Sequence, residues 1–542
     1  MKLTAEVMII LKKILPYSAI FILCSCATQA LDTAPQRADM PWQPNVASNG
    51  TLLPGKAANK HGLIIPQDFT LPANTTLTPR TPDTRIQTQH IYTLSELIDL
   101  AQSSNPTTRV AWNAARDAAL AVGITRTAYL PHLSASVVGG YTYQRNNGTH
   151  PRLSNAGAIG TGINDALSQA EGISGGIQNH NSGSGEVQTL GMEWLLFDFG
   201  KREAIVHATQ QAQLASNVLF TAAHQKVIYD VTLAFYTHAA AAARVDLITQ
   251  AVKNATIVQN AAEMRLKQGQ GTLVDVTQAR QNTAQAELRL VQAQNAAENT
   301  YLELMTAMGI SPSSQLSIQN VGNRPLTLSD TRLSDAMVKQ AVSQRPDVLA
   351  AYANAKASED RIRAAKAEFL PKIFLSGNIA YTTGHLALSS VPGVGSDSAP
   401  TLNLSSNNFS SLILGGVSIP VFDGGLRAAV MKQAQNQANT AQTLLNRTLD
   451  QAVKQIIIAQ NSLRASLNAY AAANKLQAAA QTTFDAALGA YKQGVGSITQ
   501  ASIAQTGLID AQLGQSDTYY AALIAAASLG FATGSMGHTA GL

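Results

Sequence analysis

The sequence predicts a mixed α and β membrane protein built from two copies of one unit, each a β-hairpin joined to a long helical hairpin. Three observations lead to this prediction: short motifs that recur at a fixed offset, runs in which apolar residues alternate with small or polar ones, and two long stretches, 201–268 and 426–493, with almost no Gly or Pro. Motifs that stay in register over most of a chain indicate an internal duplication.

The duplicated motifs keep one constant offset at the start of each copy and a second, smaller offset in the rest. Asn105-Pro106 and Leu130-Pro131 match Arg345-Pro346 and Leu370-Pro371; Phe197-Asp198 with Arg202 matches Phe422-Asp423 with Arg427; and Lys267-Gln268-Gly269 matches Lys492-Gln493-Gly494. The offset changes only between the Leu-Pro and Phe-Asp motifs, so a loop of variable length, longer in the first copy, is expected there. We predict a first repeat at 93–309, a linker at 310–332, a second repeat at 333–534 and a tail at 535–542.

The N-terminus has the pattern of a bacterial export signal. Lys12-Lys13 precede an apolar run over residues 14–23, which is too short to span a bilayer comfortably. The segment Leu23-Cys24-Ser25-Cys26 resembles a lipobox, in which Cys26 takes the lipid; plain signal cleavage nearby is the alternative. We predict a lipoprotein signal peptide at 1–25 and lipidation of Cys26. The chain has only 2 cysteines, so no disulfide is expected in the mature protein.

Residues 26–92 are predicted to form a Pro-rich tether. Eight of the 19 prolines lie between residues 27 and 92, where apolar periodicity is weak. Such composition is typical of an extended linker, and plain disorder would leave the same pattern.

Each repeat is predicted to begin with a helix and continue into a β-hairpin. Proline at 106 and 346 suits a first helical turn, and the period changes to two after each Leu-Pro motif. Leu133 to Tyr143 then alternate apolar or small residues with mostly Ser, Thr and Gln, and Leu190 to Leu196 form a second alternating run. We predict hairpins at 131–198 and 372–423, with Gly/Ser/Asn-rich tips at about 146–186 and 384–409. Strands of about ten residues are long enough to cross a membrane at a tilt.

Each repeat is predicted to end in a long helical hairpin, at 201–308 and 426–531. Residues 201–268 contain no Gly or Pro, and their copy contains only Gly489. At ~1.5 Å per residue such a helix is about 100 Å long. The turns between the helices, Gln268–Thr272 and Gln493–Ser497, contain glycines that permit the left-handed backbone at a helix end.

Strands with an apolar face cannot lie in lipid with open edges, because each unpaired backbone group there costs several kcal/mol. One chain supplies four strands, whereas membrane barrels begin at about eight, so the barrel must be shared between at least two chains. The polar inner face indicates a water-filled pore.

These duplicated motifs, in this order and spacing, resemble those of the TolC family of bacterial outer-membrane efflux proteins over about residues 90–535. The lipobox is similar to that of the family's lipoprotein branch. The resemblance implies a trimeric 12-stranded outer-membrane β-barrel, with four strands per chain, continuous with a long periplasmic α-helical barrel. One departure is Leu195, where the second copy has the usual Pro420.

The resemblance also implies functions for the turns at the far end of the helical hairpins. In the family these turns dock the helical hairpin of a periplasmic adaptor. The matching positions here are Gly269, Gly271, Thr272, Gly494, Gly496 and Ser497. The alternative is that the glycines only end helices.

Asp275 and Tyr491 match a family pair that bonds across the closed periplasmic tip, so the resemblance implies a gate at these two residues. The alternative is an exposed aspartate and a tyrosine that packs between helices. The family's aspartate rings are replaced by Gln500 and Ile503, and the arginine that often assists closure is replaced by Gly496. Weaker block by divalent cations than in members with the rings is therefore expected.

Nothing in the sequence indicates catalysis, a cofactor or a metal site. The histidines are scattered, the glycine-rich segment 155–162 lacks a Lys-Ser/Thr pair, and the net charge of +5 is too dispersed to favour nucleic acid. We expect a passive exit duct that forms a homotrimer in outer-membrane lipid and works with a periplasmic adaptor (membrane fusion protein) and an inner-membrane transporter. The alternatives are a type I protein secretion duct rather than drug or metal efflux, a structural envelope-bridging lipoprotein, and, least of all, a lipid-anchored enzyme.

Overall fold

The computed structural model describes residues 34, 45–53, 71–78, 86–87, 89–145, 180–321, 326, 333–384 and 408–536. The chain divides into two units, Met1–Arg85 and Ile86–Leu542. In the first unit, strands β1 (Asn45–Val46) and β2 (Leu52–Leu53) pair antiparallel. Cys26 and most of both predicted hairpin tips lie outside the described residues.

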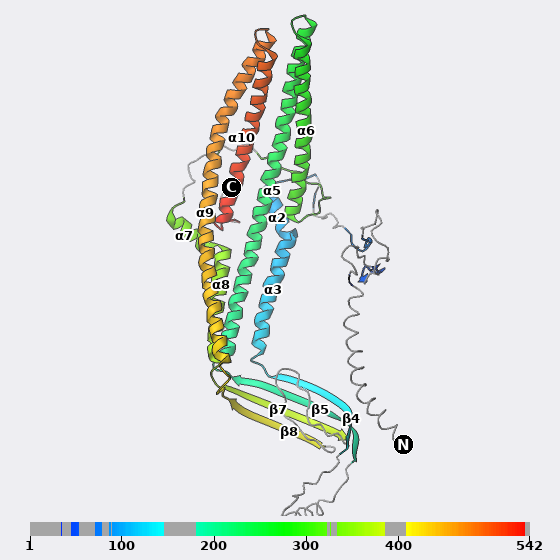
Figure 1. Ribbon diagram of the computed structural model, residues 1–542, viewed down its shortest axis with the longest axis vertical. Helices are drawn as coiled ribbons and strands as arrows, with labels where there is room; N and C mark the ends of the chain where they lie inside the picture. Colours follow the sequence, from blue (N-terminus) through cyan, green and yellow to red (C-terminus); the bar gives the residue numbers. More distant parts are fainter. Residues whose placement is uncertain are drawn as a thin grey trace, which may run out of the picture. The chain divides into compact units, whose positions relative to one another are not determined.

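The second unit repeats one series of elements twice (Figure 1). Its helices are α2 (Leu94–Ser104), α3 (Pro106–Thr127), α5 (Lys201–Lys267), α6 (Leu273–Met308), α7 (Asp335–Gln344), α8 (Pro346–Ala367), α9 (Leu426–Lys492) and α10 (Ile498–Ala532). Its strands are β3 (Ile91–Tyr92), β4 (His132–Arg145), β5 (His180–Phe197), β6 (Ser317–Ile318), β7 (Lys372–Gly384) and β8 (Asn408–Ser418). Helices α3 and α8 both have 22 residues, and α5 and α9 both have 67, as an internal duplication requires.

The four long strands form one antiparallel sheet in the order β4-β5-β7-β8. Each half contributes one hairpin, and β5 of the first half pairs with β7 of the second. One irregularity interrupts this pairing, between Leu195 and Phe197, just before β5 gives way to the corner that starts α5. Strands β4 and β8 therefore stand at the two ends of the sheet.

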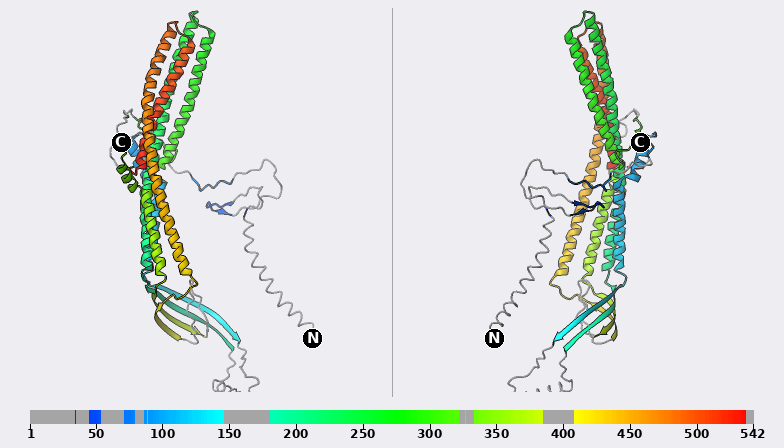
Figure 2. Two further views of the ribbon diagram at one scale, coloured as in Figure 1. Left: turned by 60° about the vertical axis from the view of Figure 1, so that its left-hand side comes forward. Right: turned by 90° about the vertical axis from the view of Figure 1, so that its right-hand side faces the viewer.

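The helices lie side by side in a row that continues from the sheet (Figures 1 and 2). Nearer the sheet, α3 packs on α5, α5 on α8 and α8 on α9. Nearer the tips of the helical hairpins, α6 packs on α5, α5 on α10 and α10 on α9. Helix α5 thus lies inside the row, whereas α3, α6 and α9 lie at its ends.

None of the helices in the described ranges combines the length and the apolar character needed to cross a lipid bilayer.

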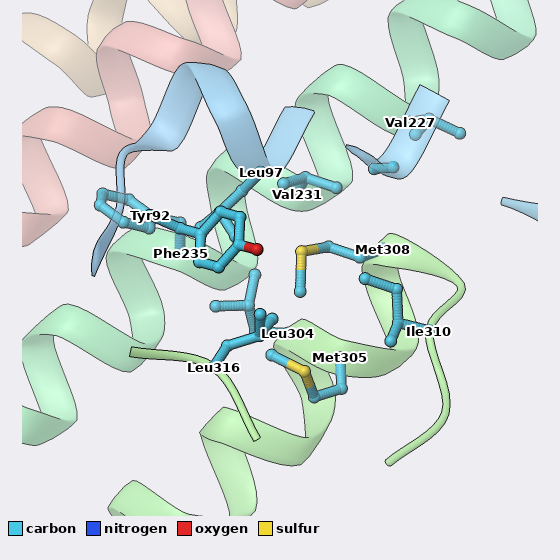
Figure 3. Packing of buried hydrophobic residues seen from close by; sticks show 11 residues of the cluster. Tyr92, Leu97, Val227, Val231, Phe235, Leu304, Met305, Met308, Ile310 and Leu316 are labelled. Carbon is cyan, nitrogen blue, oxygen red and sulfur yellow. The ribbon is translucent and has the colours of Figure 1, made fainter. Parts of the chain in front are cut away.

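A mixed aliphatic and aromatic core joins the start of the first repeat to the end of its helical hairpin (Figure 3). Leu97, Val231, Met305 and Met308 are fully enclosed in it. The cluster also contains Tyr92 from the predicted tether, and Ile310 and Leu316 from the predicted linker. Strand β3 pairs parallel with β6, which fixes the two segments to each other.

The structure therefore differs from two predicted boundaries. The tether was expected to reach residue 92, but the unit boundary follows Arg85, because Tyr92 is buried and β3 is paired. Part of the predicted linker is likewise packed into the core of the first repeat. Strands of two residues carry too little apolar periodicity to be recognised in a sequence.

Each repeat has an equivalent hydrogen bond between the residue that precedes its 22-residue helix and the end of its helical hairpin. Asn105 Nδ2 donates to the carbonyl oxygen of Ala307 at 2.8 Å, near the end of α6. At the matching place, Arg345 Nη1 donates to the carbonyl oxygen of Ala532 at 2.7 Å, at the end of α10. Each residue also precedes the proline that begins the next helix. A polar side chain here satisfies a carbonyl that a helix end would otherwise leave unpaired.

Gly309 is expected to tolerate alanine worse than its counterpart Gly534. Both have positive φ, 71° and 72°, so both substitutions cost about 1–2 kcal/mol in backbone strain. A Cβ at 309 would also lie 2.7 Å from Asn105 Cα, whereas one at 534 would lie 3.6 Å from Arg345 Cα. Gly309→Ala should therefore lose a further ~1–3 kcal/mol of folding free energy, measured by thermal or denaturant unfolding in detergent. Equal losses in the two variants would contradict this interpretation.

Candidate functional site at the helical-hairpin tips

The two predicted turns end α5 and α9 in the same backbone conformation. Gly269 has φ 73° and Gly494 has φ 83°, the left-handed region that terminates a helix. Gln270 N donates to the Arg265 carbonyl at 2.9 Å, and Val495 N donates to the Ala490 carbonyl at 3.0 Å. The two glycines therefore have a structural purpose as helix stops, and adaptor docking stays a prediction.

The second glycine of each turn lies close against the preceding helix and leaves little room for a side chain. A Cβ on Gly271 would lie 3.0 Å from the backbone nitrogen of Leu266, and one on Gly496 would lie 3.1 Å from Ala490 Cβ. The chain folds tightly back over the last turn of the preceding helix at both places. These turns are consequently short and stiff rather than loose loops.

Thr272 and Ser497 begin the return helices α6 and α10 as N-caps. Thr272 Oγ1 accepts from Asp275 N at 3.2 Å, and Asp275 Oδ2 accepts from Thr272 N at 3.0 Å, which completes a capping box. Ser497 and Gln500 repeat the arrangement. In this chain Asp275 is therefore a helix-capping residue at the start of α6. Gln500, which is uncharged, caps the start of α10 in the same way.

Tyr491 is buried at the tip, with 2% of its surface exposed. It belongs to a cluster that joins α5 and α6 to α9 and α10 and includes Val258, Phe484 and Leu508. Its hydroxyl has no hydrogen-bond partner in the described part of the chain, so the expected bond to Asp275 is not made here. Burial raises the pKa of Tyr491, as does the negative charge of Asp275, and Arg265 opposes both. The gate role of this pair stays a prediction.

Arg265 connects the two tips, and sequence reasoning missed it. Its Nη1 donates to the Tyr491 carbonyl at 2.9 Å and its Nη2 to the Gln270 carbonyl at 3.1 Å. The guanidinium also lies over the Tyr491 ring, 4.8 Å from the centroid. One sequence signal was present: a cation in the last turn of a helix suits the carbonyls exposed there. Its counterpart in the second repeat is Ala490, so the contact has no copy.

Two further polar contacts lie just behind the tip. Glu263 accepts from Arg280 Nη2 at 3.0 Å, which joins α5 to α6, and this hydrogen bond is the main cause that lowers the pKa of the Glu263 carboxyl. Asn282 Nδ2 donates to Ser502 Oγ at 2.9 Å, which joins α6 to α10. The first contact braces one hairpin, whereas the second, with Arg265 and the buried cluster, holds the two hairpin tips together.

The Phe-Asp motif forms the corner where strand becomes helix at the other end of α5. Arg202 and Asp198 form a buried ion pair with 3.1 Å between Nε and Oδ2. The same guanidinium donates to the carbonyls of Ala128, Leu195 and Leu196 and lies over the Tyr129 ring. One arginine therefore ties together the end of α3, the end of β5 and the start of α5.

Within the ranges that the structure describes, no group of three or more His, Cys, Asp or Glu side chains is placed to hold a metal ion.

Comparison with known proteins identifies the chain's relatives. A model of the outer membrane efflux protein family matches residues 97–310 and 337–535. Outer membrane protein OprJ of Pseudomonas aeruginosa is 26% identical over 306 residues, 55% of this chain and 59% of OprJ. Protein CyaE of Bordetella pertussis is 25% identical over 451 residues, 82% of this chain and 85% of CyaE.

The solved structures agree on the fold. The structure of CusC, described in terms of transmembrane channel formation, superposes with a TM-score of 0.66 at 19% identity, covering 87% of this chain and 99% of CusC. The predicted family and the predicted fold, two β-hairpins and two long helical hairpins in one duplicated chain, are thereby confirmed. The match to OprJ spans less than two thirds of that protein's length. Because the family model covers most of the chain, in both repeats, the chain belongs to the outer membrane efflux protein family.

Proposed function

We propose that this chain is the outer-membrane exit duct of a tripartite efflux or secretion system, through which substrates pass without energy input at this site. The observation that carries the proposal is the four-stranded sheet whose end strands β4 and β8 have no further partner in the described part of the chain. A row of helices that includes two of 67 residues each, α5 and α9, continues from the sheet. Open strand edges are unfavourable in lipid, so the sheet must be completed by other strands.

Other copies of the chain are the simplest source of those strands. Exposed apolar side chains such as Leu133, Val137, Ile413 and Val417 mark one face of the sheet as suited to lipid. Three copies would supply twelve strands, enough for a barrel with a water-filled interior. The proposed homotrimer lies in outer-membrane lipid and continues as a ring of helices into the periplasm.

The tips are the proposed docking site for a periplasmic adaptor. Val495 is 81% exposed, and Val274 and Leu273 at the start of α6 are 73% and 66% exposed. Exposed apolar side chains beside stiff turns suit contact with the apolar side chains of another helical hairpin. The turn residues Gly269, Gly271, Thr272, Gly494, Gly496 and Ser497 would shape this surface. The adaptor would link the duct to the inner-membrane transporter that supplies the energy.

Asp275 and Tyr491 are proposed as part of a gate at the same tips. Their surroundings bring together a carboxylate, a buried phenol and Arg265 where two helical hairpins meet. Separation of the hairpins would have to break the contacts of Arg265 with the carbonyl and the ring of Tyr491. Binding of an adaptor that favours separated hairpins would therefore open the tip.

Lipidation of Cys26 is proposed to add an anchor beside the barrel. The barrel remains the principal attachment, because acyl chains hold a protein less firmly than segments that span the bilayer. Labelling with an alkyne-bearing palmitate should mark the wild-type chain and leave Cys26→Ala unmarked, while both insert. Labelling of Cys26→Ala would refute the assignment.

Planar-bilayer recording tests the duct itself. The purified full-length chain should produce stepwise conductance, and Arg265→Ala should raise the fraction of time that the channel is open. The control is a preparation unfolded before addition, which should give a flat trace. Zero conductance from properly assembled protein would refute the duct and favour a structural envelope lipoprotein.

Cross-linking in cells tests the docking surface. Val495→Cys, at an exposed position, should capture an adaptor protein with a short maleimide–succinimidyl ester linker, which joins the cysteine thiol to lysine amines of the partner. Leu302→Cys, on α6 away from the tip and 44% exposed, is the matched control and should capture none. Capture of the same protein by both variants would contradict docking at the tip. The inner-membrane transporter that works with the captured adaptor would then identify the substrate class.

A further inference from the structure

The sheet has one apolar and one polar face, and the strand register assigns each residue to one of them. Ser136 of β4 and Thr189 of β5 stand opposite each other, with 2.6 Å between their hydroxyl oxygens. Val137 and Ile413 lie on the other face, which is suited to lipid. In the proposed duct the face of Ser136 and Thr189 therefore lines the pore.

The pore-lining face also carries large apolar side chains at the end of the sheet that adjoins the helices. Phe374 on β7 stands opposite Leu195 on β5 and opposite Gly416 on β8. Its ring lies across the glycine, because a Cβ on Gly416 would come within 2.6 Å of Phe374 Cζ. Leu412 and Leu414 lie on the same face of β8 and are 45% and 48% exposed, while Phe374 is 38% exposed. Leu195, Phe374, Leu412 and Leu414 form the inner apolar patch.

The fold does not require apolar side chains at most of these positions. The first repeat builds the equivalent hairpin with Ser134 where β7 has Phe374, and with Thr189 where β8 has Leu414. Leu195 in turn occupies the position at which the second repeat has proline. Contiguous apolar side chains that are exposed without being needed by the fold indicate a binding surface.

A carboxylate lies beside the inner apolar patch. Glu193 on β5 lies in the same cross-strand row as Leu414, two strands away. Neighbouring strands are about 4.8 Å apart, so about 10 Å separates the two backbones. Glu193 is exposed, and His132 stands opposite it on the side away from the patch. Lys372, on the same face of β7, forms an ion pair with Glu368, with 2.8 Å between Nζ and Oε2. The negative charge of Glu193 is therefore available to a ligand on the patch.

We propose that the inner apolar patch and Glu193 form a contact site for a small organic cation with an apolar body, and that such amphiphilic cations are the substrate class of this duct. The inference rests on the proposed duct, because a substrate reaches this face from inside the pore. Phe374 and the leucines cover the apolar body, and the carboxylate of Glu193 attracts the positive group. Small-molecule sites combine apolar side chains with a few polar groups in this way.

The composition of the site disfavours other small substrates. Glu193 would repel an organic anion. A metal ion binds through oxygen, nitrogen or sulfur ligands, whereas the patch offers it only hydrocarbon. A molecule gains from both parts of the site only if it joins an apolar body to a positive group at a distance of about two strands.

The same geometry makes the contact weak. The site is an open wall rather than a closed cavity, so a bound ligand keeps one side in water. A conducting pore needs contacts of this kind, since a substrate that binds tightly leaves slowly. Three copies of the chain would present three such sites at one level of the pore.

Photolabelling of the assembled full-length protein in phospholipid vesicles tests the site. The probe is a naphthylmethyl-ammonium ion that carries a diazirine, and mass spectrometry locates the labelled residues. In the wild type, the labelling that excess naphthylmethyl-trimethylammonium displaces should concentrate at residues 374 and 412–414. Phe374→Ser/Leu414→Thr, which introduces the residues of the first repeat, should reduce it by ~tenfold. Glu193→Gln should reduce it by about threefold, because an exposed charge acts through water and salt.

A matched variant and two competitors serve as controls. Val138 lies on the same face in β4, outside the patch, so Val138→Thr should leave the labelling unchanged. Tetramethylammonium has the charge without the apolar body, and naphthalenesulfonate has the body with the opposite charge. Neither should displace the probe at a concentration at which naphthylmethyl-trimethylammonium does. Conductance in planar bilayers shows that each variant has assembled.

The outcomes separate this inference from the proposed duct. Displacement by naphthalenesulfonate or by zinc ions as effective as that by naphthylmethyl-trimethylammonium would overturn the substrate class. Unchanged labelling of Phe374→Ser/Leu414→Thr would overturn the site. Conductance without displaceable labelling on this face would retain the duct and reject the contact site, whereas labelling of the patch without conductance would retain the site and reject the duct.

Discussion

Replacement of Arg202 by alanine should be among the most destabilising single changes in the chain. The Arg202 and Asp198 side chains are only 8% and 5% exposed, and the guanidinium donates to three backbone carbonyls from two segments. Removal leaves the Asp198 carboxylate buried without its cation and three carbonyls without their donor. Loss of one partner of a buried ion pair costs about 3–5 kcal/mol. We expect a matching loss of unfolding free energy in detergent and a lower amount of assembled protein in the membrane.

The second repeat contains its own control for this prediction. Arg427 and Asp423 occupy the equivalent corner, with 2.9 Å between Nε and Oδ2, but their side chains are 15% and 27% exposed. Water can replace more of their interactions, so Arg427→Ala should cost no more than about 1 kcal/mol. A larger loss from Arg427→Ala than from Arg202→Ala would show that assembly, rather than burial in one chain, decides the stability of the two corners.

Replacement of Arg265 by alanine should loosen the contact between the two helical-hairpin tips. The change removes two charge-assisted hydrogen bonds and the contact with the Tyr491 ring. If one such hydrogen bond contributes a net ~1.5–3 kcal/mol, the population of open tips should rise by about tenfold or more. Single-channel recording in planar bilayers measures this as longer open times at unchanged amplitude of the fully open state.

Tyr491→Phe distinguishes a tip held by Arg265 from a tip held by a hydrogen bond of the Tyr491 hydroxyl. The Tyr491 hydroxyl has no partner in the described part of the chain, so its loss should leave the open time unchanged if Arg265 holds the tip closed. A rise as large as that of Arg265→Ala would instead assign the latch to a bond from the hydroxyl, such as the predicted bond to Asp275. Arg265→Lys should fall between wild type and alanine, because lysine keeps the charge and loses the planar fork that reaches two carbonyls.

The parts of the fold that depend on local patterns were predictable from the sequence. Long runs without Gly or Pro indicated the helices, alternation indicated the strands, and the duplication indicated their number. Thr272 and Asp275 also carry the spacing of a capping box, so the structural role of Asp275 could have been recognised from residues three positions apart.

Contacts between distant segments could not be predicted in this way. Arg265 and Tyr491 are 226 positions apart, and Asn105 and Ala307 are 202 apart. No local pattern links such residues, and the partner atoms are backbone carbonyls, which every residue has. The pairing of β3 with β6 was missed for a related reason: two-residue strands gain their stability from the core around Tyr92 rather than from their own sequence.

The equal lengths of α5 and α9, 67 residues each, restrict how this chain can change in evolution. Deletion of one residue from α5 alone would draw its tip back by about 1.5 Å and turn it by about 100°, since an α-helix has 3.6 residues per turn. Arg265 would then point away from Tyr491, and the two turns would no longer lie level for a shared partner. Insertions and deletions should therefore survive between the strands of each β-hairpin, where the two copies already differ in length. In the long helices they should survive only as whole turns, introduced into both repeats together.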